Sequence, residues 1–349
     1  MSDHSSWESR KLRYWSECSG QSRRTGLRTS HPAPAASPAQ ARLESLVLEQ
    51  LGTSPDLCAH PFGITSLSSA DTSLALYLDA YMGRKRCSFP EHCLSRLLPA
   101  APATGGGDDP HGIAGLRMSG IEADDRHLHL YMVKGTGPTA TLVLALPKGL
   151  TEGWADIERR HRRWCDENGL RPLWTAPQLD GVESGYLSTY LSLEGSRARR
   201  AAVGSGLLRR IALFHTVTAF YRIQCWDDGD SWKVDARTAH PRARWRDQLL
   251  QRLCHPRWGL PVHMAHRFCR CAEPDTPTSG TAPATSTSTA TPPATTTPST
   301  CASTPAPKGT TTTGRSQHCT RSAPQRTGWP VPSPSKQSST TTGTVRQGG

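Results

Sequence analysis

A group of cysteines and histidines near residue 260 has the residue types of a metal site. Cys254, His263, His266 and Cys269 follow the spacing C-x8-H-x2-H-x2-C, and Cys271 comes two residues later. Thiolates and imidazoles together bind Zn²⁺ in tetrahedral geometry with four ligands. The segment therefore predicts either a zinc ion that staples a basic module or, as the alternative, a basic helix end whose cysteines and histidines pack or face water.

Two further histidines share one face of an expected strand. Between His127 and Val133 the residues alternate, which places His127 and His129 on one face and Leu128 and Leu130 on the other. A pair of imidazoles on one face is half of a metal site. The alternative is a strand surface that faces solvent or a partner.

Two arginine segments lie about ninety residues apart. The first is Gly115-Leu-Arg-Met-Ser119, which contains Arg117, and the second is Gly206-Leu-Leu-Arg209-Arg210. Lys134 stands between them at the end of the expected strand, and Trp226 follows the second segment. Arginine and lysine are the side chains that neutralise phosphate oxygens, so the order of these residues directs attention to nucleic acid.

These motifs, in this order, resemble those of the tyrosine recombinases, the integrase family of DNA strand-exchange enzymes. The similarity covers roughly residues 112–237. It implies a recombinase-like catalytic domain in which Arg117 and Arg209 clamp the scissile phosphate. It also implies that Lys134 protonates the leaving oxygen and that Trp226 donates a hydrogen bond to the phosphate. The family's chemistry requires no metal.

The expected nucleophile departs from the family's pattern. Asp235 stands where the family has its tyrosine, and all seven tyrosines of the chain lie at or before Tyr221. Without that hydroxyl no covalent protein–DNA intermediate can form. We therefore expect a DNA-binding protein without strand cleavage. The alternative is a zinc-stapled regulatory or interaction protein, and a chain with no settled fold is a third.

The charge distribution supports a polyanionic partner. The net charge is +12 with a pI near 9.4, and residues 191–270 hold 15 Lys and Arg against 6 Asp and Glu. Residues 101–190 hold 9 against 12. A basic half beside a neutral half favours duplex DNA as the partner. Within the basic half we expect phosphate contacts from four arginines: Arg210, Arg237, Arg242 and Arg244.

The elements that would position these residues are mostly helical. Residues 41–98 are expected to form a small helical region, with Leu43, Val47 and Leu51 on one stripe and Leu74 to Tyr81 in a second helix. Helices are also predicted over residues 152–168 and 205–223. The strand at residue 127 pairs with a second at residues 139–146 as a hairpin. The expected fold class is mixed, mainly α with a small β-hairpin.

Both ends are expected to be disordered around a basic domain over residues 99–271. Residues 1–40 are rich in Ser, Arg, Pro and Ala, and residues 276–314 contain 37 Thr, Ser, Pro, Ala or Gly among 39. The disordered tail is expected from residue 272 onward. No secretory signal or apolar run of spanning length is visible. We expect an intracellular protein, nuclear in a eukaryote and otherwise cytoplasmic, without a membrane partner or small-molecule substrate.

Overall fold

The structure is a computed structural model whose described residues all lie in one compact unit, Met1–Thr295; the second unit is Thr296–Gly349. The described residues are 3–26, 35–53, 60–82, 87–103, 110–133, 140–191, 194–217, 222–227, 232–238, 245–260, 262 and 284–290. Among these residues, no helix combines the length and the apolar character needed to cross a membrane.

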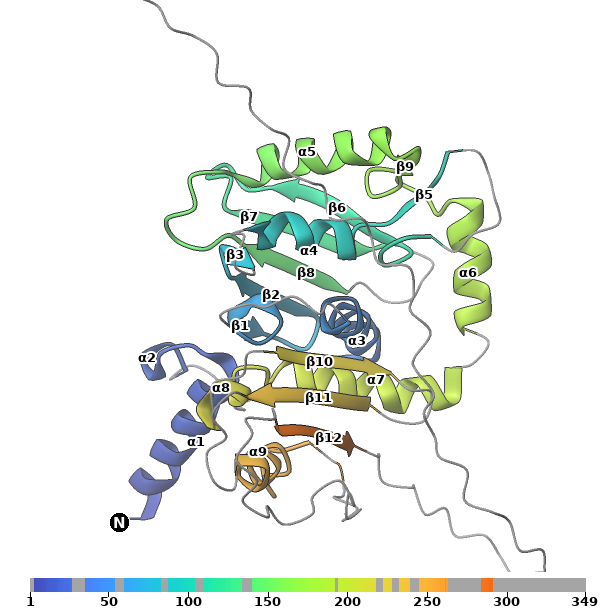
Figure 1. Ribbon diagram of the computed structural model, residues 1–349. Coiled ribbons are helices and arrows are strands. Elements are labelled where there is room, and N and C mark those ends of the chain that lie inside the picture. Colours follow the sequence, from blue (N-terminus) through green and yellow to red (C-terminus); the bar gives the residue numbers. More distant parts are fainter. Residues whose placement is uncertain are drawn as a thin grey trace, which may run out of the picture. The chain divides into compact units, whose positions relative to one another are not determined.

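A five-stranded sheet forms the centre of the unit, in the order β1-β2-β8-β7-β6 (Figure 1). Its strands are β1 (Ile64–Ser69), β2 (Ser73–Leu78), β8 (Thr141–Ala145), β7 (His127–Met132) and β6 (Leu116–Ile121). β2 and β8 are parallel, and the other neighbours are antiparallel. The fold is thus mixed α/β with far more sheet than the single hairpin that the sequence predicted.

The strand and hairpin predicted after residue 127 are confirmed. β7 and β8 pair antiparallel, with Leu130 opposite Leu142. Leu128 and Leu130 are buried on the core face, whereas His127 and His129 lie half-exposed on the other face. The two-residue alternation gave the correct element because one face of this sheet packs on the core.

The second helix predicted within residues 41–98 is wrong, because those residues form strand β2. Leu74, Leu76 and Leu78 are fully buried, and the residues between them are half-exposed. Apolar residues two apart fit one face of a strand, whereas a helical face needs intervals of three and four. The first helix of that region is confirmed as α3 (Pro38–Gly52), which buries Leu43, Val47 and Leu51.

Helix α5 (Trp154–Glu167) confirms the predicted helix and crosses beyond the β6 edge of the sheet in Figure 1. Trp154 anchors its first turn: the indole Nε1 donates to Leu144 O at 3.0 Å. His161 is buried between the rings of Trp164 and Trp174, with centroids 5.8 and 5.1 Å away. Burial lowers the pKa of His161 to about 4. The imidazole is therefore neutral at pH 7.

The long helix predicted over residues 205–223 is interrupted. α7 (Glu194–Leu208) ends before Arg209, α8 (Leu213–Val217) is a separate turn, and strand β10 (Arg222–Asp227) follows. The amides of Arg210 and Ile211 donate to carbonyls three residues earlier, which tightens the chain out of α-helical geometry. α3 packs along α7 and reaches β10, where the carbonyl of Cys225 leaves no room for a side chain at Gly52.

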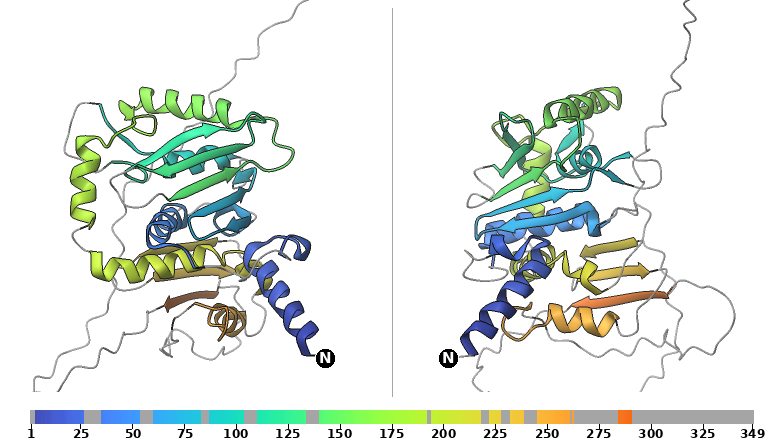
Figure 2. Two further views of the ribbon diagram at one scale, coloured as in Figure 1. Left: turned by 180° about the vertical axis from the view of Figure 1, so that it is seen from behind. Right: turned by 90° about the vertical axis from the view of Figure 1, so that its left-hand side faces the viewer.

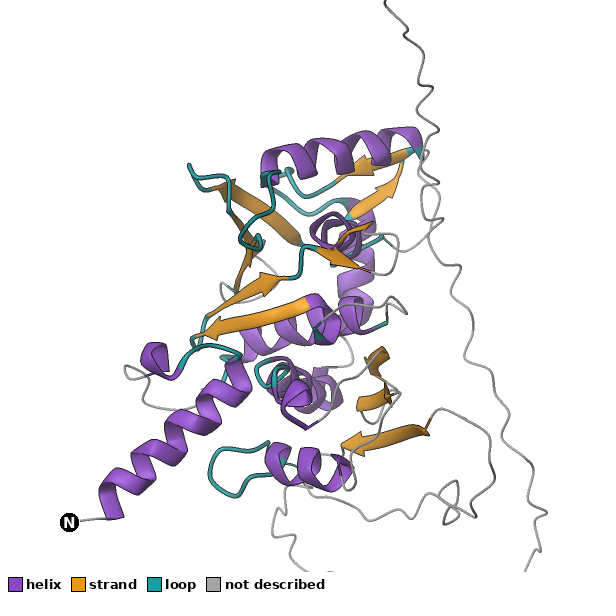
Figure 3. Ribbon diagram, turned by 60° about the vertical axis from the view of Figure 1, so that its left-hand side comes forward, coloured by secondary structure: helices purple, strands orange, loops and turns teal. Residues whose placement is uncertain are grey.

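A second sheet contains β10, β11 (Trp232–Thr238) and β12 (Ala284–Ala290), in that order and antiparallel. Figure 3 shows its strands beside α7 and α9 (Trp245–Leu253). β12 lies within the segment that composition predicted to be disordered from residue 272 onward, and its seven residues of the Thr/Ser-rich tract extend the sheet by backbone pairing. The rest of that segment lies outside the described residues. Backbone hydrogen bonds need no apolar side chain, which explains why composition did not indicate this strand.

The N-terminal segment is also different from the expected disordered tail. α1 (Asp3–Ser19) is a helix that buries Tyr14, Trp15 and Cys18. It projects from the unit in Figure 2 and ends at Gly20, whose φ of 71° suits glycine. Composition misled here because only these three apolar residues, at positions that share one side of the helix, are buried within an otherwise polar segment.

Short elements complete the described fold: α2 (Arg23–Gly26), η1 (Pro61–Gly63), β3 (Tyr81–Met82), β4 (Cys87–Ser88), α4 (Phe89–Leu97), β5 (Ala100–Pro102), β9 (Leu170–Pro172) and α6 (Gly181–Leu191). β3 pairs with β4, and β5 with β9. Several polar side chains are held between these elements and the two sheets.

Candidate functional site

Arg117, the first arginine expected to clamp a phosphate, is buried in β6 with 1% exposure. Its guanidinium forms a two-pronged ion pair with Glu183 of α6, at 2.6 Å from Nη2 to Oε2 and 2.9 Å from Nη1 to Oε1. The carbonyls of Leu116, Ala176 and Gln178 accept the remaining hydrogen bonds. An arginine has five N–H donors, so all five are used inside the protein.

Arg209, the second expected clamp, is buried as completely. It donates to both carboxylate oxygens of Glu44 on α3, at 2.6 and 2.7 Å, and to Ala70 O at 2.6 Å. Ser205 and Gln40 also donate to that carboxylate. Arg209 and Glu44 are 1% and 0% exposed, respectively. This ion pair joins α3, the end of α7 and the β1–β2 turn.

The two arginines lie at opposite edges of the five-stranded sheet. Arg117 is on edge strand β6, and the carbonyl that Arg209 contacts, Ala70, follows edge strand β1. Four strand spacings separate these edges, roughly 19 Å at ~4.8 Å per spacing. The structure therefore does not bring Arg117 and Arg209 to one phosphate. Each arginine is instead paired with a carboxylate near it, Arg117 with Glu183 and Arg209 with Glu44.

The other residues of the expected site fall in different places. Trp226 is half-buried in β10 opposite Lys233. Asp235, in the expected nucleophile position, lies in β11 at 8% exposure. Arg237 lies in β11 opposite Arg222. Three residues with expected roles lie outside the described residues: Lys134, Arg242 and Arg244.

Of the four residues expected to bind zinc, only Cys254 lies among the described residues. Cys254 follows α9 as a half-buried free thiol whose pKa is raised by burial. His263, His266 and Cys269 lie outside the described residues, so the zinc-stapled alternative stays a prediction.

Arg210, expected to touch DNA, instead holds the turn after α9. It is 5% exposed and donates from Nη2 to Trp258 O at 2.7 Å and from Nη1 to Gly206 O at 3.0 Å. The turn of residues 254–260 is thereby fixed against α7. Arg210 thus positions a surface element of the protein.

That turn meets α1 in a cluster of aromatic rings. Trp258 stacks on His255 at 4.7 Å between centroids and contacts Tyr14 at 5.6 Å and Trp7 at 6.3 Å. The hydroxyl of Tyr14 donates to Arg252 O at 2.9 Å, which ties α1 to α9. Tyr14 and Trp258 are buried, while Trp7 and His255 are half-exposed.

Basic side chains lie on the same two segments as these rings, α1 and residues 252–258. Arg10 and Arg257 are exposed, and no carboxylate among the described residues pairs with either. Lys11 lies 5.3 Å from the Trp7 ring centroid. We call the whole group the aromatic–basic face, and it consists of Trp7, Arg10, Lys11, Arg13, Tyr14, Arg252, His255, Arg257 and Trp258. Its five cations exceed the two nearby carboxylates, Glu8 and Glu17.

The electrostatics of the aromatic–basic face come from its arginines and lysine. Partial burial and the neighbouring Arg257 lower the pKa of His255, so this ring is neutral at pH 7. Glu17 bridges Arg13 at 2.9 Å and Arg252 at 3.7 Å. Arg10 and Arg257 therefore remain as the cations most able to reach an anion from solution.

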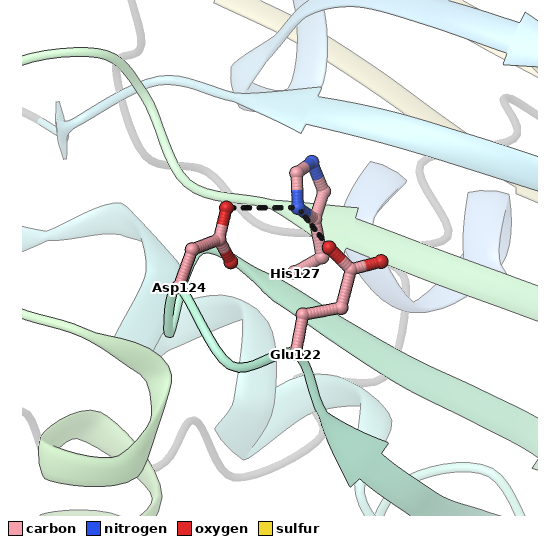
Figure 4. A group of neighbouring side chains, drawn as sticks. All are labelled: Glu122, Asp124 and His127. Atoms are coloured by element: carbon pink, nitrogen blue, oxygen red, sulfur yellow. Dashed lines mark ion pairs between the residues drawn. The ribbon is translucent and has the colours of Figure 1, made fainter.

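A second cluster lies at the β6–β7 turn, on the histidine face that the sequence indicated (Figure 4). His127 Nδ1 is 2.9 Å from Glu122 and 3.8 Å from Asp124, and His129 Nε2 is 2.8 Å from Glu122. One ligand atom each from Glu122, Asp124 and His127 lies within 4.8 Å of the others. The two histidines lie within contact distance of these exposed carboxylates, and exposed acidic groups commonly gather in this way without a metal.

A third cluster joins His60, Asp79 and His215. The Asp79 carboxylate accepts one hydrogen bond from ring Nδ1 of His60 at 2.7 Å and another from the His60 backbone amide at 2.9 Å. The hydrogen bond to the ring raises the pKa of the His60 imidazole. The His215 ring on α8 lies 5.0 Å from the His60 ring at an angle of 69°. Sequence reasoning missed this cluster because His215 is remote from His60 along the chain and no local motif marks either residue.

No family model, curated protein or solved structure matches this chain.

Proposed function

We propose that this protein binds duplex DNA through the aromatic–basic face. The carrying observation is that Arg10 shares helix α1 with Trp7 and Tyr14, and Arg257 lies beside Trp258, which contacts both of those rings. Both arginines are exposed, and neither has a carboxylate partner among the described residues. Phosphate oxygens carry the negative charge that would pair with these two positively charged guanidiniums.

The energetics of such binding are mainly electrostatic. Each phosphate that a Lys or Arg neutralises releases condensed counterions, so affinity falls steeply as salt rises. The half-exposed rings of Trp7 and His255 add apolar contact area for sugars. A neutral His255 makes the attraction independent of pH around neutrality, because the arginines keep their charge.

The proposal assigns no catalysis to the chain. Arg117 and Arg209 use their donors on Glu183 and Glu44, and an acidic residue, Asp235, occupies the expected position of the nucleophile. A recombinase-like origin is compatible with DNA binding but supplies none of its contacts here. We therefore expect no covalent adduct between the protein and a nicked DNA substrate.

The test compares two double variants of the full chain that remove equal charge. Arg10→Gln/Arg257→Gln changes the proposed face, and Arg159→Gln/Arg163→Gln changes two exposed arginines of α5. Fluorescence anisotropy with a labelled duplex, repeated over a salt series, gives the slope of log affinity against log salt. We expect the first variant to reduce that slope by about two units, at ~0.9 per phosphate contact, and the second to leave it unchanged.

Three outcomes would overturn the proposal. Equal weakening by both double variants would mean that DNA senses only net charge. Unchanged binding in the first variant would place the contacts elsewhere in the chain. A preference for single strands or RNA over the duplex would reject duplex DNA as the partner.

A further inference from the structure

Helix α1 packs on the protein through its second half. Among its residues with described side chains, none before Tyr14 is buried, whereas Tyr14, Trp15, Cys18 and Ser19 all are. Figure 2 shows the N-terminal end of α1 extending away from both sheets. The first half of α1, residues 3–13, therefore forms a projecting helix that is anchored at one end.

Three exposed polar side chains of this half share one side of the helix. Ser6, Ser9 and Arg13 recur at intervals of three and four residues, which places them within ~60° of one another at ~100° per residue. We call these three residues the outer stripe. The exposed acid Glu8 lies at least ~100° around the helix from each of them. The outer stripe thus presents hydroxyl and guanidinium donors with no acid between them.

The outer stripe borders the cations that are proposed to contact phosphates. The rings of Trp7 and Tyr14 mark the side of α1 that meets the turn carrying Arg257. Arg10 lies between that side and the outer stripe, by the same helical spacing. A groove of duplex DNA is bounded by phosphates, so a surface beside the phosphate contacts faces the groove. The outer stripe is that surface.

Arg13 is oriented for recognition of paired acceptors. Its Nε donates to Glu17 Oε1 at 2.9 Å, and Glu17 lies 3.7 Å from Arg252, which ties the pair to α9. The Arg13 side chain is 62% exposed, and Nε is its one engaged donor group among the described residues. A guanidinium has five N–H donors in a fixed fork, so both Nη groups are available to a ligand.

The dimensions and donors of this half suit the major groove. A helix with its side chains is ~10–12 Å across, and the major groove of B-DNA is ~12 Å wide. Residues 3–13 extend ~16 Å at ~1.5 Å per residue. Guanine presents its O6 and N7 acceptors side by side in that groove, and arginine binds both at once, while serine hydroxyls contact any base edge.

We propose that the first half of α1 enters the major groove of duplex DNA and that Arg13 recognises a guanine there through both Nη groups. This inference rests on the DNA binding proposed above and adds a base preference to it. Ser6 and Ser9 contact the neighbouring base edges, while Arg10 and Arg257 hold the phosphates beside the groove. The positive charge of Arg10, Arg13 and Arg257 complements the polyanion.

The experiment first selects preferred duplexes from a randomised library with the full parent protein. The selected duplexes should share a guanine, and its replacement by adenine should weaken binding by roughly 5- to 150-fold in anisotropy titrations. Replacement by 7-deazaguanine removes the N7 acceptor in the major groove and leaves the minor-groove edge unchanged. This replacement should weaken binding by the parent severalfold.

The variant Arg13→Gln should bind the guanine, adenine and 7-deazaguanine duplexes equally. Its salt dependence should match that of the parent, because a base contact releases no phosphate counterion. The matched control is Arg163→Gln, which removes the same charge from an exposed position on α5 and should keep the full preference. Arg13 is exposed, so the melting temperature of Arg13→Gln should equal that of the parent.

The outcomes separate this inference from the proposed function. Duplex binding without a selected sequence overturns the inference and leaves DNA binding intact. An equal loss from 7-deazaguanine in the parent and in Arg13→Gln also overturns it, because another residue then reads the base. No duplex binding by the parent overturns both. If Arg13→Gln lowers the helix content, the parent alone decides, and its indifference to 7-deazaguanine overturns the inference.

Discussion

Two sets of arginines in this molecule have opposite surroundings. Arg117 and Arg209 are enclosed with a glutamate each, whereas Arg10 and Arg257 are exposed beside aromatic rings. The first set joins distant elements of the fold, and the second remains open to an anion. The comparison shows that the number of arginines in a segment does not reveal how many can bind a ligand.

The energetic consequences should differ as sharply. Removal of one partner from a buried ion pair leaves an uncompensated charge and typically costs 3–5 kcal/mol. An exposed charge usually contributes between 0 and 1 kcal/mol to stability. Stability and binding should therefore separate: the enclosed arginines should govern unfolding, and the exposed ones should govern affinity.

The largest effect is expected from Glu44→Ala. The change leaves Arg209 buried without a counter-charge and removes the acceptor of Ser205 and Gln40. The free energy of unfolding should fall by about 3–5 kcal/mol. Urea unfolding followed by circular dichroism measures it. A loss below 1 kcal/mol would mean that this buried ion pair contributes no more to stability than an exposed charge does. The proposed difference between enclosed and exposed arginines would then be wrong.

Next comes a pH effect at His161. In the unfolded chain this histidine takes up a proton near pH 6.5, but in the folded protein only near pH 4. Stability from this group is therefore intact above pH 6.5 and decreases as pH falls toward 4, by roughly 3 kcal/mol in all. In His161→Phe that part of the decrease should vanish. Urea titrations of both proteins between pH 7 and 4 would refute the idea if the two curves ran parallel.

A smaller effect is expected from Arg257→Gln. Loss of one phosphate contact should lower the salt dependence of DNA affinity by about one slope unit. The free energy of unfolding should stay within about 0.5 kcal/mol of the parent, because the side chain is exposed. Anisotropy and urea unfolding on the same preparation test both statements. If Arg257→Gln lowers the free energy of unfolding but leaves the salt dependence of DNA affinity unchanged, then Arg257 stabilises the fold, as Arg117 and Arg209 do, and does not contact phosphate.

The smallest effect is expected from Arg163→Gln on α5. This arginine is exposed and lies on a helix where Arg159, Arg160 and Arg162 are paired with acids. Neither DNA affinity nor unfolding should change beyond error. A measurable loss of affinity would extend the DNA-binding surface beyond the aromatic–basic face.

Local patterns predicted local elements well. The alternation that begins at His127 correctly gave strand β7, and the helix predicted over residues 152–168 is α5, which buries Trp154, Ile157 and His161 at helical spacing. The segment at Leu74 was assigned to the wrong element although its two-residue spacing was visible. The helix that carries Trp7 and Tyr14 was missed because polar composition concealed its apolar stripe.

The partners of charged residues could not be predicted in the same way. Glu44 and Arg209 meet across 165 positions, and their contact exists only because α3 packs along α7. Neither residue carries a local signal that separates an enclosed arginine from an exposed one. The same holds for His60 and His215, whose proximity depends on where η1 and α8 lie in the finished fold.

The one parallel pairing in the central sheet determines the order in which that sheet can be completed during synthesis. β1 and β2 form a hairpin early, but β2's other neighbour is β8, and residues 79–140 lie between them. As the chain leaves the ribosome, the edge of β2 stays unpaired until the β6–β7–β8 meander has emerged. Contacts this distant in sequence slow folding because a long loop must close first. Assembly of the sheet thus waits for its central pairing, which joins an N-terminal hairpin to a later-formed three-stranded half.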